Sequence, residues 1–334
     1  MNASLTSKLI IILCIFCLIA GIFSIEKNES YMGDENQKQS KNIIPNANKV
    51  AVIELNGPIV TSSETSFFSS DTNAAGMLKS LRLAKDDKDI KGVILKINSP
   101  GGTVAMSQNI YNQIISTRQN KPVIALLDDV AASGGYYIAS AADRIIAQDG
   151  TLTGSIGVIF SFMDYHNLLI NKLDINSVVI KSGKYKDIGS STRQMTEEER
   201  VLMQNIVDDS YSQFLDAIRK GRIQRKDTYS AEKVDLTEEN LVSHADGRVF
   251  TGKQAKELGF VDVTGDIDSA KAMIESMIKE KSKSPFPVKL IVYNKKNALN
   301  EYLSGMTEYS TGIKLKDILP TSVILSRKPL YLWE

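Results

Sequence analysis

Two glycine-rich segments of the sequence each follow an apolar run and precede a helical pattern. They are Asn98-Ser-Pro-Gly-Gly102 and Ala131-Ala-Ser-Gly-Gly-Tyr-Tyr-Ile138. Glycines at a strand-to-helix junction let backbone N–H groups approach a ligand closely, beside the positive end of the helix. A serine flanked by small residues there exposes its hydroxyl, so Ser133 is a candidate nucleophile and the Gly134 N–H a candidate oxyanion donor. Taken alone, each segment also fits an ordinary turn, and Ser133 also fits a helix N-cap.

A serine nucleophile needs a base at neutral pH, and the chain offers few candidates. Its two histidines, His166 and His244, both lie in polar stretches typical of a protein surface. The other candidates are the three lysines of Lys181-Ser-Gly-Lys-Tyr-Lys186, which are Lys181, Lys184 and Lys186.

A lysine acts as a base near pH 7 only where its pKa is lowered by roughly 3 units through burial. That requirement predicts an enclosed site with a hydroxyl partner for the amine. Ser155, in the segment Thr151-Leu-Thr-Gly-Ser-Ile-Gly157, is the candidate for this partner.

The composition excludes several other kinds of chemistry. The 40 Lys+Arg nearly cancel the 39 Asp+Glu across 334 residues, so we expect no basic surface for nucleic acid. Two histidines and two cysteines leave little for a His/Cys metal site, and we expect neither a metal nor a cofactor. Both cysteines, Cys14 and Cys17, lie near the N-terminus, so the rest of the chain has no disulfide or thiolate chemistry.

An uncharged apolar run at residues 9–25 is close to the shortest length that crosses a bilayer as a helix. A signal-peptide cleavage site after Ser24 would place the bulky Ile22 where a small residue is needed, which favours an uncleaved anchor over a cleaved signal. The short leader 1–8 is then expected to stay cytoplasmic, with the following domain outside the membrane. Residues 26–48 are predicted to form a solvated spacer.

Strand and helix patterns alternate through the region after the spacer, which predicts an α/β fold with helices covering a sheet. The predicted strands are 49–55, 92–98, 122–127 and 175–180, and the predicted helices are 74–86, 103–118, 196–221, 251–258 and 266–281. Thr196 and Glu199 have the spacing of a capping box at the start of one helix. We place the folded domain at 49–281 and expect 282–334, where Pro285 breaks the helical pattern, to be a C-terminal appendage.

Five ordered motifs across residues 49–265 resemble the signal peptide peptidase A family. They are Asn98-Ser-Pro-Gly-Gly102, Ala132-Ser-Gly-Gly-Tyr-Tyr137, Thr153-Gly-Ser-Ile-Gly157, Lys181-Ser-Gly-Lys-Tyr-Lys186 and Asp246-Gly-Arg-Val-Phe-Thr-Gly252. The resemblance implies a Clp/crotonase-like fold of ββα-type units. It also implies a bacterial serine endopeptidase, anchored in the cell membrane, that degrades remnant signal peptides.

The resemblance also implies a role for each site residue. Ser133 would be the nucleophile, Lys186 the general base, and Ser155 the residue that orients the lysine. The amides of Gly102 and Gly134 would form the oxyanion hole. Single-domain members are expected to form homo-oligomeric rings in which the serine and the lysine meet across a subunit boundary.

Two other function classes share some of these features. A crotonase-like acyl-CoA enzyme would use the same fold and paired amides, but an exported domain would not meet acyl-CoA. A non-catalytic membrane scaffold would keep the fold, but it would need neither Ser133 nor Lys186.

Overall fold

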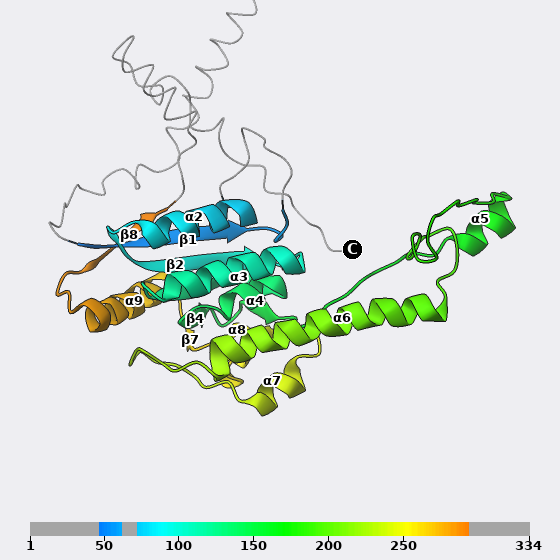
Figure 1. The fold of residues 1–334 in the computed structure, drawn as a ribbon. Helices are drawn as coiled ribbons and strands as arrows, with labels where there is room; N and C mark the ends of the chain where they lie inside the picture. Colours follow the sequence, from blue (N-terminus) through cyan, green and yellow to red (C-terminus); the bar gives the residue numbers. More distant parts are fainter. Residues whose placement is uncertain (1–46, 62–71, 294–334) are drawn as a thin grey trace, which may run out of the picture. The chain divides into compact units, whose positions relative to one another are not determined.

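The computed structural model describes residues 47–61 and 72–293 (Figure 1). Its strands are β1 (Asn48–Asn56), β2 (Ile90–Ser99), β3 (Val123–Ala132), β4 (Arg144–Ala147), β5 (Leu152–Gly154), β6 (Val249–Thr251), β7 (Val263–Thr264) and β8 (Val288–Val292). Its helices are α2 (Ala74–Asp86), α3 (Val104–Arg118), α4 (Gly134–Ala139), α5 (His166–Leu173), α6 (Glu197–Ile218), the π-helical turn η2 (Arg219–Ile223), α7 (Glu238–His244), α8 (Gly252–Glu257) and α9 (Ile267–Ser282).

The strands form one sheet in the order β6-β5-β3-β2-β1-β8, with β4 pairing with both β3 and β7. All pairs are parallel except β5 with β6. The central strands are nearly continuous apolar runs because helices cover both faces of the sheet. Helices α2, α3 and α4 pack on one face, and α9 packs on the other (Figure 1). The predicted α/β class is confirmed.

Strand β3 changes partners along its length. On one side it pairs with β2 as far as Ala131, and on the other side its first half pairs with β4 and its last residues pair with β5. The register against β2 is irregular: Ile97 pairs with Leu127 but Ser99 pairs with Ala131, so β3 has two extra residues there. Such an irregularity bends a strand. The end of β3 therefore stays beside β2 and exchanges β4 for β5 on its other side.

Residues 158–196, which we call the arm, connect β5 to α6 and include α5. None of these residues is buried. The predicted strand at 175–180 is wrong: the segment is irregular and Ile180 is 98% exposed. An apolar run makes a strand only where a sheet edge and a covering layer receive it. The described part of the chain offers neither to this segment.

Helix α6 joins the arm to the rest of the described fold, which we call the body. Its N-terminus carries the predicted capping box, in which Thr196 and Glu199 bond each other's backbone, so that prediction is confirmed. After Glu199, the first buried residue of the helix is Phe214, followed by Ala217 and Ile218. The packing of α6 on the core is thus confined to its last two turns, and Figure 1 shows the arm beyond its opposite end.

The sheet continues past the predicted domain end at residue 281. Val288–Val292 form β8, which pairs with β1 from Asn48 to Val52. The expected appendage 282–334 therefore starts too early, because its first part completes the sheet edge. The expected anchor 9–25 and most of the spacer 26–48 lie outside the described residues. Among the residues described, no helix is long and apolar enough to cross a membrane.

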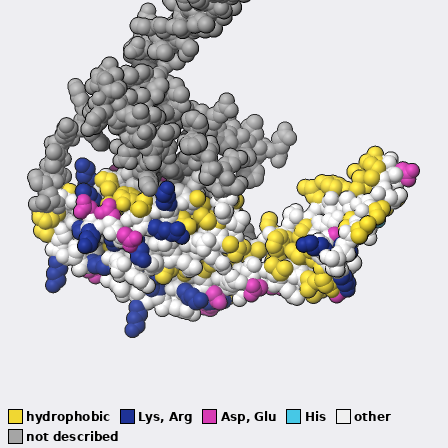
Figure 2. All heavy atoms as spheres, turned by 45° about the horizontal axis from the view of Figure 1, so that its top comes forward, with side chains coloured by type: hydrophobic (Ala, Val, Ile, Leu, Met, Phe, Trp, Pro, Cys, Tyr) yellow, Lys and Arg dark blue, Asp and Glu magenta, His cyan; other side chains and the backbone are white. Residues whose placement is uncertain are grey.

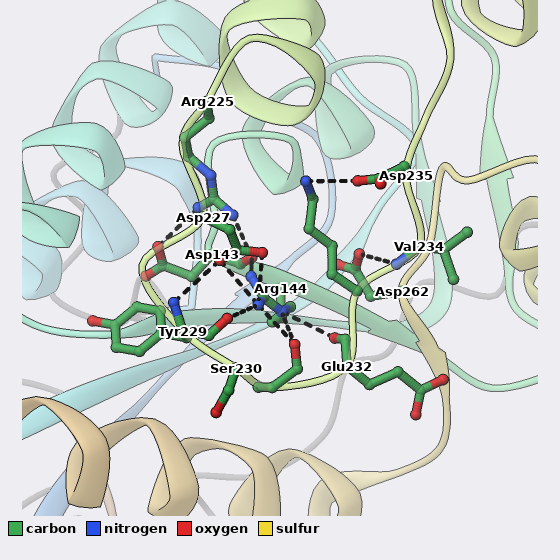
Figure 3. Close-up of polar contacts among 12 residues, drawn as sticks. Asp143, Arg144, Arg225, Asp227, Tyr229, Ser230, Glu232, Val234, Asp235 and Asp262 are labelled. Atoms are coloured by element: carbon green, nitrogen blue, oxygen red, sulfur yellow. Dashed lines mark hydrogen bonds and ion pairs between the residues drawn. The ribbon is translucent and has the colours of Figure 1, made fainter.

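Buried ion pairs hold the irregular segment 224–236 to the body. Arg144 is fully buried and donates to the carbonyls of Tyr229, Ala231 and Glu232 and to the Asp227 carboxylate (Figure 3).

Arg222 and Asp262 form the most enclosed of these ion pairs. Both side chains are 0% exposed, and their N–O distances are 2.7 and 2.8 Å. Asp262 also accepts the Ile145 N–H. Desolvation offsets much of the attraction within such a pair, but removing one partner leaves the other charge unpaired and buried.

Replacing Asp262 with alanine is therefore expected to lower the free energy of unfolding by about 3–5 kcal/mol. Chemical denaturation of the wild type and the Asp262→Ala variant measures this loss. Asp89→Ala, which removes the partner of Lys49 in an exposed pair, is the control and should leave stability nearly unchanged. Equal losses in both variants would contradict the prediction.

Candidate active site

Ser133 lies at the end of β3, directly before α4. Its backbone angles are φ 52° and ψ −119°, a region that non-glycine residues rarely occupy. Its N–H donates to the Gly154 carbonyl at 2.9 Å, and its own carbonyl accepts from Tyr137. The surroundings thus enforce a strained strand-to-helix turn, the kind of turn that exposes a nucleophilic side chain.

The loop containing Gly102 lies against this turn. Ile59 forms hydrogen bonds on both sides of Gly102: its N–H donates to the Gly101 carbonyl and its carbonyl accepts the Thr103 N–H, both at 2.8 Å. In a parallel bridge of this kind, the central residue directs its own N–H to the opposite side. A Cβ on Gly134 would lie 3.2 Å from the Gly102 nitrogen.

Gly134 is the first residue of α4, where backbone N–H groups have no acceptor within the helix. The structure therefore brings Gly102 and Gly134 together with Ser133. Two N–H groups beside a strained serine have the arrangement of an oxyanion hole.

Ser155 follows β5, the strand beside the end of β3. The register pairs Ala132 with Gly154, so Ser133 and Ser155 are the next residues on neighbouring strands. Ser155 also has a positive φ, of 49°. The structure therefore places Ser155 next to the nucleophile candidate, whereas its expected contact with a lysine amine is not formed within the described chain.

A turn at Asp246–Arg248 holds Ser155 in place. The Arg248 carbonyl accepts the Ser155 N–H at 2.7 Å, and the Gly247 N–H donates to Ile156. The Asp246 carboxylate binds the Arg248 guanidinium through both oxygens. This motif is part of the family resemblance, but the sequence predicts no role for its residues. Its only signal was an Asp-Gly turn before a short β-rich run.

The three candidate lysines have different partners. Lys181 pairs with Asp187 at 2.5 Å, and Lys184 pairs with Glu198. Glu198, together with Tyr185, raises the pKa of Lys184 and so opposes its action as a base. Lys186 is exposed, and within the described part of the chain its side chain has no ion pair or hydrogen bond.

Lys186 belongs to the arm, whereas Ser133 belongs to the body. The loop of Lys186 is tied to the first turn of α6, where Arg193 bridges Asp187 and Glu199. Tyr211, where α6 first packs against the core, lies about 18 Å beyond Glu199 at about 1.5 Å per residue. The structure of a single chain therefore does not bring these two side chains together (Figure 1).

In the residues that the structure describes, no hydrogen bond joins either histidine to Ser133. His166 begins α5 in the arm, and its Nδ1 lies 3.0 Å from the Thr192 carbonyl. His244 ends α7, and its Nδ1 lies 2.9 Å from the Asn240 carbonyl. Among the described residues, no group of three or more His, Cys, Asp or Glu side chains could hold a metal ion.

Comparisons with known proteins fit this geometry. The model of peptidase family S49 matches residues 116–281, and the Clp protease model matches residues 46–147. A protein of Synechocystis sp. described as a protease, slr0021, is 39% identical over 67% of this chain and 72% of its own length. The chain belongs to peptidase family S49. It is a serine protease of the SppA group with a Clp protease-like α/β fold.

Other relatives differ in how much of their length this chain spans. An Enterococcus faecium protein described as a signal peptide peptidase SppA is 36% identical over 70% of this chain and 64% of its own length. Protease 4 of Haemophilus influenzae is 31% identical over 70% of this chain but only 35% of its own length. The chain thus spans under two thirds of the Enterococcus relative and about a third of Protease 4.

The Gly102 loop allows a sharp test of the oxyanion hole. A Cβ on Gly102 would lie 2.1 Å from the Ile59 carbonyl oxygen, so Gly102→Ala must displace the backbone amide. Losing one donor to the oxyanion is expected to lower kcat for peptide hydrolysis by about 100- to 1,000-fold. Gly150→Ala is the control because a Cβ there meets open space. Similar activity in both variants would count against a role for this amide.

Proposed function

We propose that this chain is a membrane-anchored serine endopeptidase that uses Ser133 as nucleophile and Lys186 as general base to degrade remnant signal peptides. The observation that carries the proposal is the strained turn at Ser133, with the Gly102 and Gly134 amides beside it. A turn held in this conformation at the cost of strain is typical of a functional site.

The choice of Lys186 rests on its charge environment. Lys181 and Lys184 are each paired with a carboxylate, so burying either amine would break that pair or bury both charges. Lys186 has no such partner in the described chain, so its amine could be buried against another surface without breaking an ion pair. Ser155, beside Ser133, would then accept or donate a hydrogen bond to the amine and orient it.

The required burial supports a site shared between copies of the chain. The arm exposes many apolar side chains, a pattern visible in Figure 2, and the most exposed are Ile159, Val178 and Ile180. A surface of this kind on a projecting segment favours packing against a second protein surface. We infer that the arm of one copy packs near Ser133 of its neighbour in a ring, so that an isolated monomer is inactive.

The proposed reaction follows from this arrangement. Neutral Lys186 takes the proton of the Ser133 hydroxyl while the alkoxide attacks the substrate carbonyl carbon. The amides of Gly102 and Gly134 stabilise the resulting oxyanion. The lysine returns the proton to the leaving amine, and an acyl-enzyme forms on Ser133. The same lysine then removes a proton from water, which attacks the acyl group and frees the serine.

Two features support remnant signal peptides as substrates. The Enterococcus faecium relative is described as a signal peptide peptidase. The apolar run at residues 9–25 has the character of an anchor and would hold the enzyme in the membrane where such peptides are released. Other small or misfolded peptides are further candidates for the same site.

Substituting either member of the proposed dyad tests the chemistry. Ser133→Ala and Lys186→Ala are each expected to lower kcat for cleavage of an apolar signal-peptide substrate by at least about 1,000-fold. The full-length chain in mild detergent, assayed by mass spectrometry of the products, is suited to this measurement. Lys184→Ala is the matched control and should remain active. Activity retained in Lys186→Ala but lost in Lys184→Ala would move the base to Lys184.

A mixing experiment tests whether the site is shared. Ser133→Ala supplies an intact lysine and Lys186→Ala an intact serine, so mixed rings would contain some complete sites. Activity is therefore expected to return when the two inactive proteins are dissociated, combined and reassembled. Each variant treated alone is the control. An inactive mixture of correctly assembled rings would show that serine and lysine come from the same copy.

A further inference from the structure

The loop that carries Lys186 lies outside the buried core. No residue of the arm is buried, and the first buried residue after it is a charged one, Glu199, whose side chain is 3% exposed. A catalytic group must be held closely to its working position, because a displacement of about 1 Å can cost about 100-fold in rate. Some interaction other than core packing must therefore fix this loop.

Arg193 provides that interaction. Its Nε and Nη2 donate to the two oxygens of Asp187, each at 2.8 Å. Its Nη1 and Nη2 donate to the two oxygens of Glu199, at 2.8 and 2.6 Å. One guanidinium thus makes two bidentate contacts, the geometry in which arginine differs most from lysine.

The two carboxylates belong to different segments, one beside the proposed base and one at the start of α6. Asp187 is the residue directly after Lys186, and its side chain is only 12% exposed. Glu199 is the capping-box residue of α6 and also accepts the Thr196 N–H. Arg193 therefore joins the backbone next to the proposed base to the rigid first turn of a 22-residue helix.

We propose that Arg193 is a positioning residue for Lys186, fixing the loop of the proposed general base to the first turn of α6. The inference rests on the proposed function, since it needs Lys186 to be the base. Arg193 acts through Asp187 and does not touch the substrate. Two neighbouring contacts assist it: Lys181 also binds Asp187, and Glu198 in the same turn of α6 binds Lys184 and Tyr185.

The contacts of Arg193 with Asp187 and Glu199 do not titrate in the pH range in which the enzyme would be assayed. Arg193 lowers the pKa of Glu199 to about 2, and together with Lys181 it holds the pKa of Asp187 well below its usual range. Carboxyl groups with lowered pKa values support the folded arrangement above their ordinary pKa and lose that support only as the pH falls toward 2. Both remain ionised across an assay range of roughly pH 6–10.

The test is the pH profile of kcat for Arg193→Met, measured with the full-length chain. A loosened loop would let water reach the Lys186 amine in the assembled site, so the acidic limb of the profile is expected to move up by about one pH unit or more. At neutral pH kcat should fall by about 100-fold, with KM changed little. Arg193→Lys keeps the positive charge but cannot make the bidentate contacts, so its kcat and its acidic limb should lie between those of the wild type and Arg193→Met.

Controls separate this inference from its alternatives. Arg200→Met alters an exposed arginine of the same region whose closest carboxylate contact, to Glu197, is 3.6 Å, and its profile should match the wild type. Circular dichroism and native mass spectrometry check folding and assembly; if Arg193→Met fails either check, the profile of Arg193→Lys decides. If Arg193→Met has reduced activity but an unmoved acidic limb, or if its pH profile of kcat matches that of the wild type, Arg193 is not a positioning residue for Lys186.

A parallel assay of Lys186→Ala distinguishes a failure of the proposed function from a failure of the Arg193 inference alone. Full activity in that variant would refute the proposed base and this inference together. An inactive Lys186→Ala beside an Arg193→Met enzyme with the wild-type profile would refute the inference alone.

Discussion

The path of strand β3 is the constraint on which the rest of the structure depends. The strand is irregular near Asp128, where its partner on one side changes from β4 to β5 while Ala131 still pairs with Ser99 of β2. The end of β3 therefore lies between the residues that lead into the Gly102 loop and those that lead into Ser155. The neighbourhood of Ser133 is therefore a consequence of strand pairing more than of any single side-chain contact.

The local parts of this design could be predicted from the sequence. Helix α2 has the expected bounds, 74–86, because its apolar residues recur with helical spacing. The short strands β4 to β7 were harder, since runs of two to four residues carry no periodicity. β8 is not predicted from the sequence, because Pro285 and Pro287 before it indicate an end to regular structure. Its place depends on the open edge of β1, which no local pattern reveals.

The segment 175–180 shows the opposite error. Its β-branched apolar residues, such as Val178 and Ile180, have the composition of a buried strand. In a single chain they are exposed, because the arm has no sheet to receive them. Periodicity reports that a surface is suited to burial but not which molecule buries it. A surface buried only by another copy of the chain has the same sequence pattern as an internal core.

The difference between burial within one chain and burial against another copy also explains why the proposed site is divided between the body and the arm. The nucleophile turn needs a rigid body, because its strain is sustained only by the packed residues around Ser133 and Gly134. A lysine base instead needs to be charged and soluble before assembly and buried afterwards. A loop held by ion pairs meets both conditions, since the Arg193 contacts with Asp187 and Glu199 form without a hydrophobic core. Separating the two groups in this way would keep a free monomer from cleaving peptides, because only assembly would provide the burial that makes Lys186 a base.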